Sequence, residues 1–150
     1  MAVSPDVVGT TYPSIPAYQV GREKIREFAT AVKATDPVHH DVAAAQAAGY
    51  PDLVAPPTFA IVVSQRADAA LVNDPEAGID FSRVVHAADQ RFTHHRPVVA
   101  GDELTAAVTV DAVRPLGTGA MVTSRVEVTT VDGEKVATTV SSLLVRGEDQ

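Results

Sequence analysis

The chain has 150 residues, a formal net charge of −7 and no cysteine. This length suits one domain with a real core, the lack of cysteine excludes disulfides and thiolate chemistry, and the negative charge argues against sequence-independent binding to nucleic acid. Few aromatic residues, no tryptophan and many alanines, valines and threonines favour a β-rich interior of small branched side chains.

No segment has the features of a targeting signal or a membrane span. The first ten residues, MAVSPDVVGT, lack a basic patch followed by an apolar run, so we expect no signal peptide. A run of about 18 apolar residues is also missing from the sequence. We therefore expect a soluble, cytoplasmic protein that binds neither nucleic acid nor a membrane.

The first predicted helix covers REKIREFATAVKA, residues 22–34, after an irregular start and a short strand at residues 18–20. Its apolar side chains recur at helical spacing. Pro37 should end this helix near Thr35, because proline disfavours helical geometry in the residue before it. A short alanine-rich helix, DVAAAQAAG, should follow, with Asp41 as its N-cap.

The third predicted helix, at residues 57–72, is apolar nearly all round in its first half. Pro56 and Pro57 suit its start, where a missing N–H costs nothing. Its apolar stripe contains Phe59, Val62, Val63, Ala67, Ala70 and Leu71. We expect this helix to be buried at the centre of the fold.

From residue 83 onward the sequence alternates with the period of β-strands. Four segments have this pattern: SRVVHAADQRFTHHRP, with a bulge at residues 87–88, ELTAAVTVDAV, MVTSRVEVTTV and KVATTVSSLLV. An Asp132-Gly133 turn joins the last two. Helices followed by long antiparallel strands predict a single α+β domain over residues 1–150, in which the sheet of residues 83–145 curls round the buried helix.

Three stretches occur in an order that resembles the MaoC-like hot-dog proteins: FATAVKATDPVHHD, GYPDLVAPPTF and DQRFTHHRPVVAGDEL. This group includes the (R)-specific enoyl-CoA hydratases and the hydroxyacyl-ACP dehydratases. GREKIREFA near the start makes the chain most similar to the small actinobacterial proteins with a MaoC N-terminal, FAS1-like dehydratase domain. The resemblance covers residues 7–146 and implies a hot-dog fold, which agrees with the order of elements obtained from the residues.

The resemblance also implies a role for the segment KATDPVHHD. Active members carry Gly-Asp-x-Asn-Pro-x-His-x-Asp here, and the Asp and His hold a water or exchange protons during syn addition across an α,β-unsaturated thioester. Such chemistry needs two groups within hydrogen-bond reach of one water. The motif proline, histidine and final aspartate fall on Pro37, His39 and Asp41. The Gly-Asp pair falls on Lys33 and Ala34, so the family's acid is missing.

Asp36 and His39 are the candidate catalytic residues under this resemblance. Asp36 occupies the motif's Asn position, where it is either a displaced acid or simply a turn former before proline. His39 matches the catalytic imidazole, and the alternative is a solvated loop histidine. His40 should point away from His39 and be exposed. The remaining histidines, His86, His94 and His95, are assigned no chemistry, and Asp89-Gln90 is expected to be structural.

The start of the central helix is the expected substrate contact, through Pro57, Thr58 and Phe59. In active hydratases this segment often contains His-Gly-Met, where a backbone N–H faces the thioester carbonyl. Pro57 has no N–H to offer, so Thr58 would have to donate. The alternative is that Pro56 and Pro57 only shape the helix start.

The resemblance implies an acyl-CoA or acyl-ACP thioester as substrate, no metal and no cofactor, and a tunnel between two hot-dog domains. Ala34 makes the chain a candidate substrate-holding subunit of an (R)-specific 3-hydroxyacyl-thioester dehydratase or enoyl-thioester hydratase. It would form a homodimer, or a heterodimer with a second MaoC-like hot-dog subunit that carries the intact motif.

Two alternatives remain open. The chain could be a self-sufficient homodimeric enoyl-CoA hydratase that uses Asp36 and His39, or a non-catalytic acyl-thioester binding protein. A thioesterase is less favoured, because the carboxylate that such enzymes carry on the central helix is matched only by Asp68, late in that helix.

Overall fold

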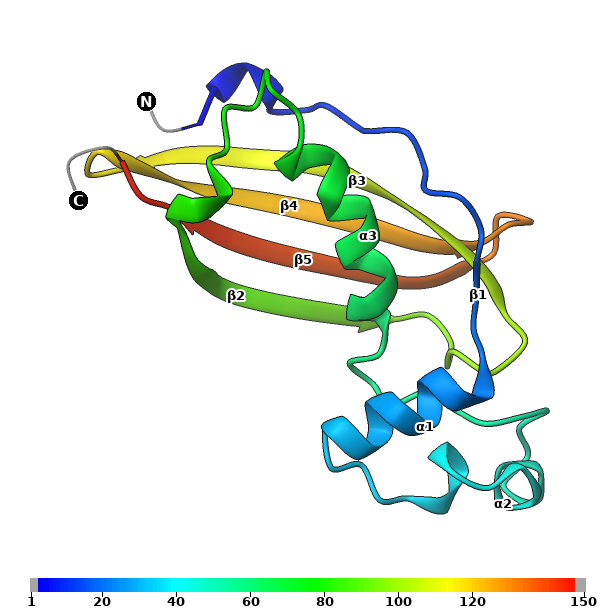
Figure 1. Cartoon of the computed structure of the whole chain (residues 1–150). Coiled ribbons are helices and arrows are strands. Elements are labelled where there is room, and N and C mark those ends of the chain that lie inside the picture. The colour runs from blue at the N-terminus through cyan, green and yellow to red at the C-terminus, as the bar shows by residue number, and fades with distance from the viewer. Residues whose placement is uncertain (1–2, 148–150) are drawn as a thin grey trace.

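The computed structural model describes residues 3–147, apart from the side chains of residues 86–88. Within this part, five strands form one antiparallel sheet in the order β1-β3-β4-β5-β2. The strands are β1 (Tyr18–Gln19), β2 (Val84–His94), β3 (Glu103–Leu116), β4 (Gly119–Thr130) and β5 (Lys135–Val145). The sheet curves behind a single central helix, and two smaller helices lie beyond the end at which that helix begins (Figure 1).

The helices are α1 (Arg22–Ala31), α2 (Val42–Ala47) and the central α3 (Ala60–Val72), with short 3-10 helices at η1 (Pro5–Val7), η2 (Pro37–His39) and η3 (Phe81–Arg83). One face of α3 is buried against the sheet through Ala60, Val63, Ser64, Ala67 and Leu71. The facing strands supply alternating buried residues such as Val108 and Val126. This arrangement confirms the predicted α+β hot-dog fold, with one helix enclosed by a curled antiparallel sheet.

The central helix begins three residues later than predicted, at Ala60. Residues 57–59 form a turn in which Phe59 N donates to the Pro56 carbonyl oxygen at 2.9 Å. Ile61 and Val62 also donate to carbonyls three residues back. The first turn is therefore tighter than an α-helix, as is common at helix ends.

Helix α1 ends at Ala31 rather than near Thr35. Lys33 has a φ of 61°, in the left-handed region. Its N–H donates to the Thr30 carbonyl, and the next N–H, of Ala34, donates to the Ala29 carbonyl at 2.8 Å. These two bonds form a Schellman motif, which ends a helix and normally places glycine at the left-handed position. The helix is thus ended by its own C-terminal turn, before Pro37 can act.

The predicted strand features are confirmed. Register shifts between β2 and β5 fall on either side of Ala87, where the bulge was predicted. Gly133 has a φ of 94° in the turn that joins β4 to β5. None of the helices in residues 3–147 has the length and apolar character needed to cross a membrane.

Candidate functional site

A cavity of about 550 Å³ lies where α3 begins. This volume is within the usual range for small-molecule sites. One wall comes from η2 and the segment before α3, and the other from the end of β2 and the residues that follow it. The lining residues are Asp36, Val38, His39, Tyr50, Val54, Ala55, Pro56, Pro57, Ala60, His94, His95, Arg96, Pro97 and Val98.

His39 is held in this wall by the backbone. Its Nδ1 lies 2.6 Å from the Val54 carbonyl oxygen, and Val54 N donates to the carbonyl of Val38 at 3.0 Å. A carbonyl oxygen only accepts hydrogen bonds, so Nδ1 carries the proton. The neutral ring then keeps Nε2 as a free acceptor. His39 is half-buried and lines the cavity.

Asp36 also lines the cavity, but its carboxylate has a structural partner. Its Oδ1 accepts a hydrogen bond from Val38 N at 3.0 Å, which caps η2. Side-chain caps of this kind satisfy a backbone N–H that the helix leaves free. Asp36 is exposed. The arrangement matches the turn-forming role and leaves the carboxylate at the solvent-facing edge of the cavity.

The expectation that His40 is exposed is wrong. His40 is half-buried, and its Nε2 lies 2.8 Å from the carbonyl oxygen of Ala34. Arg26 Nε in turn donates to the His40 carbonyl at 2.9 Å. The left-handed turn at Lys33 brings the chain back so that Ala34 meets the ring. Ala34 therefore supplies a carbonyl to the loop, where the family motif would place an acid.

The three expected substrate contacts lie in different environments. Pro57 is exposed and lines the cavity. Thr58 is exposed, and its carbonyl accepts from Ile61 N. Phe59 is fully buried, and its ring meets the ring of Phe28 edge-on with centroids 5.3 Å apart. Phe59 thereby holds α1 against the start of α3.

His94 and His95 lie at the cavity, although sequence analysis assigned them no chemistry. His94 stacks on Phe92 with centroids 6.1 Å apart, and His95 Nε2 lies 3.1 Å from Thr138 Oγ1. The segment after β2 runs beside the segment before α3, where Ala55 N donates to the Val98 carbonyl at 2.8 Å. This pairing brings His94 and His95 into the same cavity lining as His39. Pairing between segments far apart in the sequence leaves no local pattern. The signal that could have indicated it was the second pair of adjacent histidines, His94-His95, after His39-His40.

Arg96 fixes this second wall. Its guanidinium contacts both carboxylate oxygens of Asp102, at 2.9 and 3.2 Å, and its Nε contacts Glu134 at 2.8 Å. Asp102 also accepts from Val99 N at 2.9 Å. The carboxylate of Asp102 raises the pKa of Arg96. Gly101 has a φ of 97° and forms the turn that brings Asp102 to the arginine.

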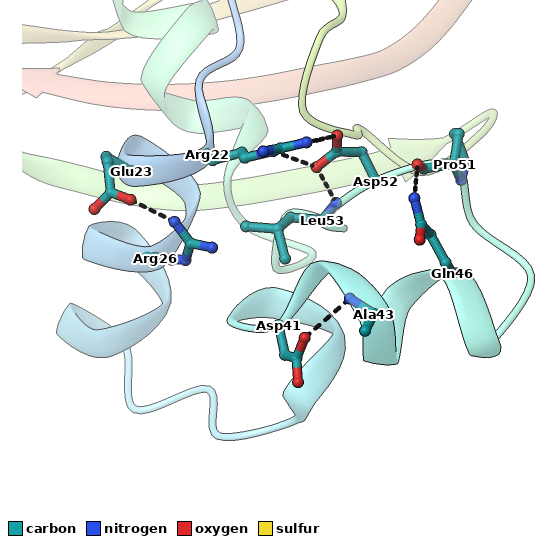
Figure 2. Close-up of polar contacts among 9 residues, drawn as sticks. All are labelled: Arg22, Glu23, Arg26, Asp41, Ala43, Gln46, Pro51, Asp52 and Leu53. Carbon is teal, nitrogen blue, oxygen red and sulfur yellow. Dashed lines mark hydrogen bonds and ion pairs between the residues drawn. The ribbon is translucent and has the colours of Figure 1, made fainter.

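The small helices are tied to the segment that leads into the cavity (Figure 2). Arg22 contacts both carboxylate oxygens of Asp52, the shorter contact being 2.8 Å, and Leu53 N donates to the same carboxylate at 2.7 Å. Both interactions lower the pKa of Asp52. Asp41 caps α2 through Ala43 N, as predicted. These contacts position the backbone that carries the Val54 carbonyl.

Metal binding finds no support in the described side chains. Within residues 3–147, no three His, Asp or Glu side chains are grouped so that they could hold a metal ion. The side chain of His86 lies outside the described residues. The polar side chains that line the cavity are three imidazole rings, the carboxylate of Asp36, the phenol of Tyr50 and the guanidinium of Arg96.

A family model for the FAS1-like dehydratase domain region matches residues 6–139 of the chain. A UPF0336 protein of Leifsonia xyli subsp. xyli is 56% identical over 147 residues, which is 98% of each chain. This match covers both the cavity segments and the sheet.

Two solved structures are similar over nearly the whole chain. One is the truncated HadBC complex, a (3R)-hydroxyacyl-ACP dehydratase from Mycobacterium tuberculosis, with 35% identity and a TM-score of 0.80 over 93% of this chain and 97% of that chain. The other is a MaoC-like dehydratase with 33% identity and a TM-score of 0.85. This chain is covered to 95% in that match, but it spans only 43% of the longer protein.

Proposed function

The chain belongs to the family of FAS1-like dehydratase domains, and on that premise we propose that it is the substrate-holding subunit of an (R)-specific 3-hydroxyacyl-thioester dehydratase or enoyl-thioester hydratase. One observation carries the proposal. Lys33 has the left-handed backbone, with a φ of 61°, that suits the glycine of the family motif. This supports the alignment of the motif, and Ala34 then occupies the position of the missing acid.

The chemistry explains why the missing acid matters. Hydration adds a hydroxyl group to one carbon of the enoyl thioester and a proton to the next, so protons move at two places. His39 offers one acceptor, its free Nε2. The carboxylate of Asp36 already accepts a hydrogen bond from Val38 N. This favours a substrate-holding role over a self-sufficient hydratase, since general acid–base catalysis needs both groups at the substrate.

The sheet supports the assembly that the proposal requires. Among the described strands, β2 pairs only with β5, so one edge of its eleven residues is free. A free edge of this length is a template for pairing with another chain. The similar HadBC protein is a complex. We infer a homodimer when the chain is isolated and a heterodimer with a catalytic MaoC-like subunit, with an acyl-CoA or acyl-ACP thioester in the cavity.

Restoring the motif tests the proposal. The isolated chain should hydrate crotonyl-CoA very poorly. The double variant Lys33→Gly, Ala34→Asp should gain part of the roughly 10²–10⁴-fold that acid–base catalysis typically contributes. His39→Ala in that background should remove the gain. Lys33→Gly alone is the matched control, because it restores the backbone preference without the acid and should leave the rate unchanged.

Two results would favour the alternatives. Brisk turnover by the unmodified chain, lost on Asp36→Asn, would make it a self-sufficient hydratase. Binding of acyl-CoA without turnover, alone, restored or with a MaoC-type partner, would make it a binding protein. If the restored chain is inactive yet the complex is active, the missing part is the N–H that would face the thioester carbonyl. Pro57, which has no N–H, is then the next residue to change.

A further inference from the structure

A second, smaller cavity lies between α3 and the strands β2, β4 and β5. Its volume is about 90 Å³, which is enough for a group the size of a water molecule or somewhat larger. The lining is largely apolar, but it also contains the carboxylate of Asp68 and the amide of Gln90. The residues are Ile61, Gln65, Asp68, Leu71, Val72, Gln90, Ser124, Ser141 and Leu143.

Two buried polar atoms in this lining have no hydrogen-bond partner among the described residues: Asp68 Oδ1 and Gln90 Nε2. The other end of the Gln90 amide is bound, because Ser141 Oγ donates to Gln90 Oε1 at 2.7 Å. Leaving a buried donor or acceptor unsatisfied is costly, and such groups call for an explanation. Here an acceptor on the helix and a donor on the sheet share one small cavity.

Helix α3 and strand β2 contribute to both cavities: each supplies one residue, Ala60 and His94, to the lining of the larger one, and several to the smaller one. On α3, Ile61, Gln65 and Asp68 are spaced by four and three residues, so they share one helix face that starts next to Ala60 at the larger cavity. On β2, Gln90 and His94 lie on one face of the strand, with Phe92 between them. Along the helix axis, Asp68 lies about 12 Å beyond Ala60.

We propose that the Asp68–Gln90 cavity is a subsite for an uncharged polar group, a hydroxyl, carried on the acyl chain of the substrate at a distance from the thioester. This rests on the proposed function, because the acyl chain must reach the subsite from the larger cavity. A hydroxyl accepts a hydrogen bond from Gln90 Nε2 and donates one to Asp68 Oδ1. The carbon atoms beside it contact Ile61 and Leu143. The hydroxyl formed in the reaction lies at the thioester end and is a different group.

The charges that line the cavity favour an uncharged ligand group over an anion. Burial raises the pKa of Asp68 to about 6, and no Lys or Arg belongs to the lining. An ionised Asp68 would repel a carboxylate or phosphate. A hydroxyl pairs with Asp68 in either ionisation state, because it can donate to the carboxylate or accept from the carboxylic acid.

Calorimetric titration with two acyl-CoA series tests the subsite in the purified full-length chain. One series is saturated and unsubstituted, and the other carries a terminal hydroxyl, each in increasing length. The two should bind equally while the chains are short. At the length that reaches Asp68, the hydroxylated ligand should bind about tenfold more tightly, as one well-made hydrogen bond to a buried group allows.

Three variants locate the effect. Asp68→Leu and Gln90→Leu should each abolish the preference for the hydroxylated ligand while keeping affinity for the unsubstituted one. Thr93→Val is the matched control, since it removes an exposed hydroxyl from β2 outside the lining of either cavity and should keep the preference. Asp68→Asn retains the size and an acceptor oxygen, so it should keep part of the preference if Asp68→Leu fails to fold.

The remaining outcomes separate the two proposals. Binding of the unsubstituted series without preference at any length would overturn the subsite alone. Binding of neither series would overturn the proposed function and the subsite together. A preference that survives both leucine variants would overturn the assignment to this pair. If Asp68→Leu loses the dimer but keeps the preference for the hydroxylated ligand, Asp68 and Gln90 contact the other subunit rather than the ligand.

Discussion

The loop of residues 33–41 and the Asp68–Gln90 cavity use polar groups in opposite ways. In the loop, which aligns with the catalytic motif, the polar side chains are bound to the backbone: Asp36 to Val38, His39 to Val54 and His40 to Ala34. In the small cavity, two buried polar atoms lack any partner among the described residues. Hydrogen bonds in the loop fix its shape, whereas the cavity retains unused capacity for a ligand.

This difference indicates which polar groups serve stability and which are available for function. A satisfied polar group adds about 1 kcal/mol to stability, and an unsatisfied buried one costs about 1–3 kcal/mol. The hydrogen bonds of the loop therefore stabilise the folded chain. The unsatisfied polar atoms of the cavity lower its stability, and a bound group that pairs with them would offset this loss.

The largest expected effect concerns stability against pH at Asp68. Its pKa is raised by burial from an ordinary value of 3.8 to about 6, so the folded chain binds this proton more tightly than the unfolded chain. The contribution of Asp68 to stability should be complete below pH 4 and should be lost as the pH rises through about 6, by up to about 3 kcal/mol. Urea unfolding at several pH values measures the change.

Asp68→Asn is the control for that experiment. The variant has no proton to lose in this window, so the fall in stability between pH 4 and 6 should be smaller by the contribution of Asp68. An unchanged pH profile in the variant would mean that Asp68 is solvated in solution, and the contrast between loop and cavity would fail.

A smaller loss should follow removal of the loop anchor His40. His40→Ala deletes the contact with the Ala34 carbonyl and should lower the free energy of unfolding by about 1 kcal/mol. In the restored Lys33→Gly, Ala34→Asp background, the same change should lower activity by misplacing residue 34. Rescue by His40→Gln, which keeps a donor, would identify the hydrogen bond rather than ring packing as the cause.

A modest gain is expected from Lys33→Gly. The left-handed conformation costs an ordinary residue about 1–2 kcal/mol, and glycine gives back about 0.5–1 kcal/mol through its greater freedom in the unfolded chain. The net stabilisation should therefore be roughly 0.5–1 kcal/mol, read from chemical unfolding. A loss of stability would mean that contacts of the Lys33 side chain compensate for its strained backbone. The alignment of Lys33 with the glycine of the motif would then lose its support.

The smallest effect should come from the exposed Arg22–Asp52 pair. Arg22 lowers the pKa of Asp52, so the pair stabilises the folded chain at neutral pH and this contribution is lost as the pH falls through the depressed pKa. Asp52→Asn should lower the melting temperature slightly at low salt, and high salt should erase the difference. Its pH dependence has the opposite sign to that of Asp68.

The fold was predictable because the spacing of apolar residues and the amino-acid composition indicate its helices and strands. The buried stripe of α3, the alternation of β3 as far as Val110 and of β4 and β5, and the bulge at Ala87 are local patterns that the structure confirms. The end of α1 was wrong because a left-handed lysine gives no signal in the sequence. Its consequence, the half-buried His40, was missed for the same reason.

The candidate site was predictable only in part. His39 was singled out from its place in a motif, and it lies in the lining of the cavity. His94 and His95 reach the cavity through a chain reversal that no local pattern records. Asp68 attracted notice only as a poor match to a thioesterase. Its missing partner is a property of three-dimensional packing, which residue types alone do not reveal.

The free edge of β2 has a consequence for how the chain is made. A strand of eleven residues with unpaired N–H and C=O groups, and with Val85 exposed near its start, is prone to pair with any other extended chain. Under the proposed pairing with a second subunit, chains made in excess of that subunit would present this edge to one another and aggregate. Co-expression with that subunit should therefore raise the yield of well-dispersed protein.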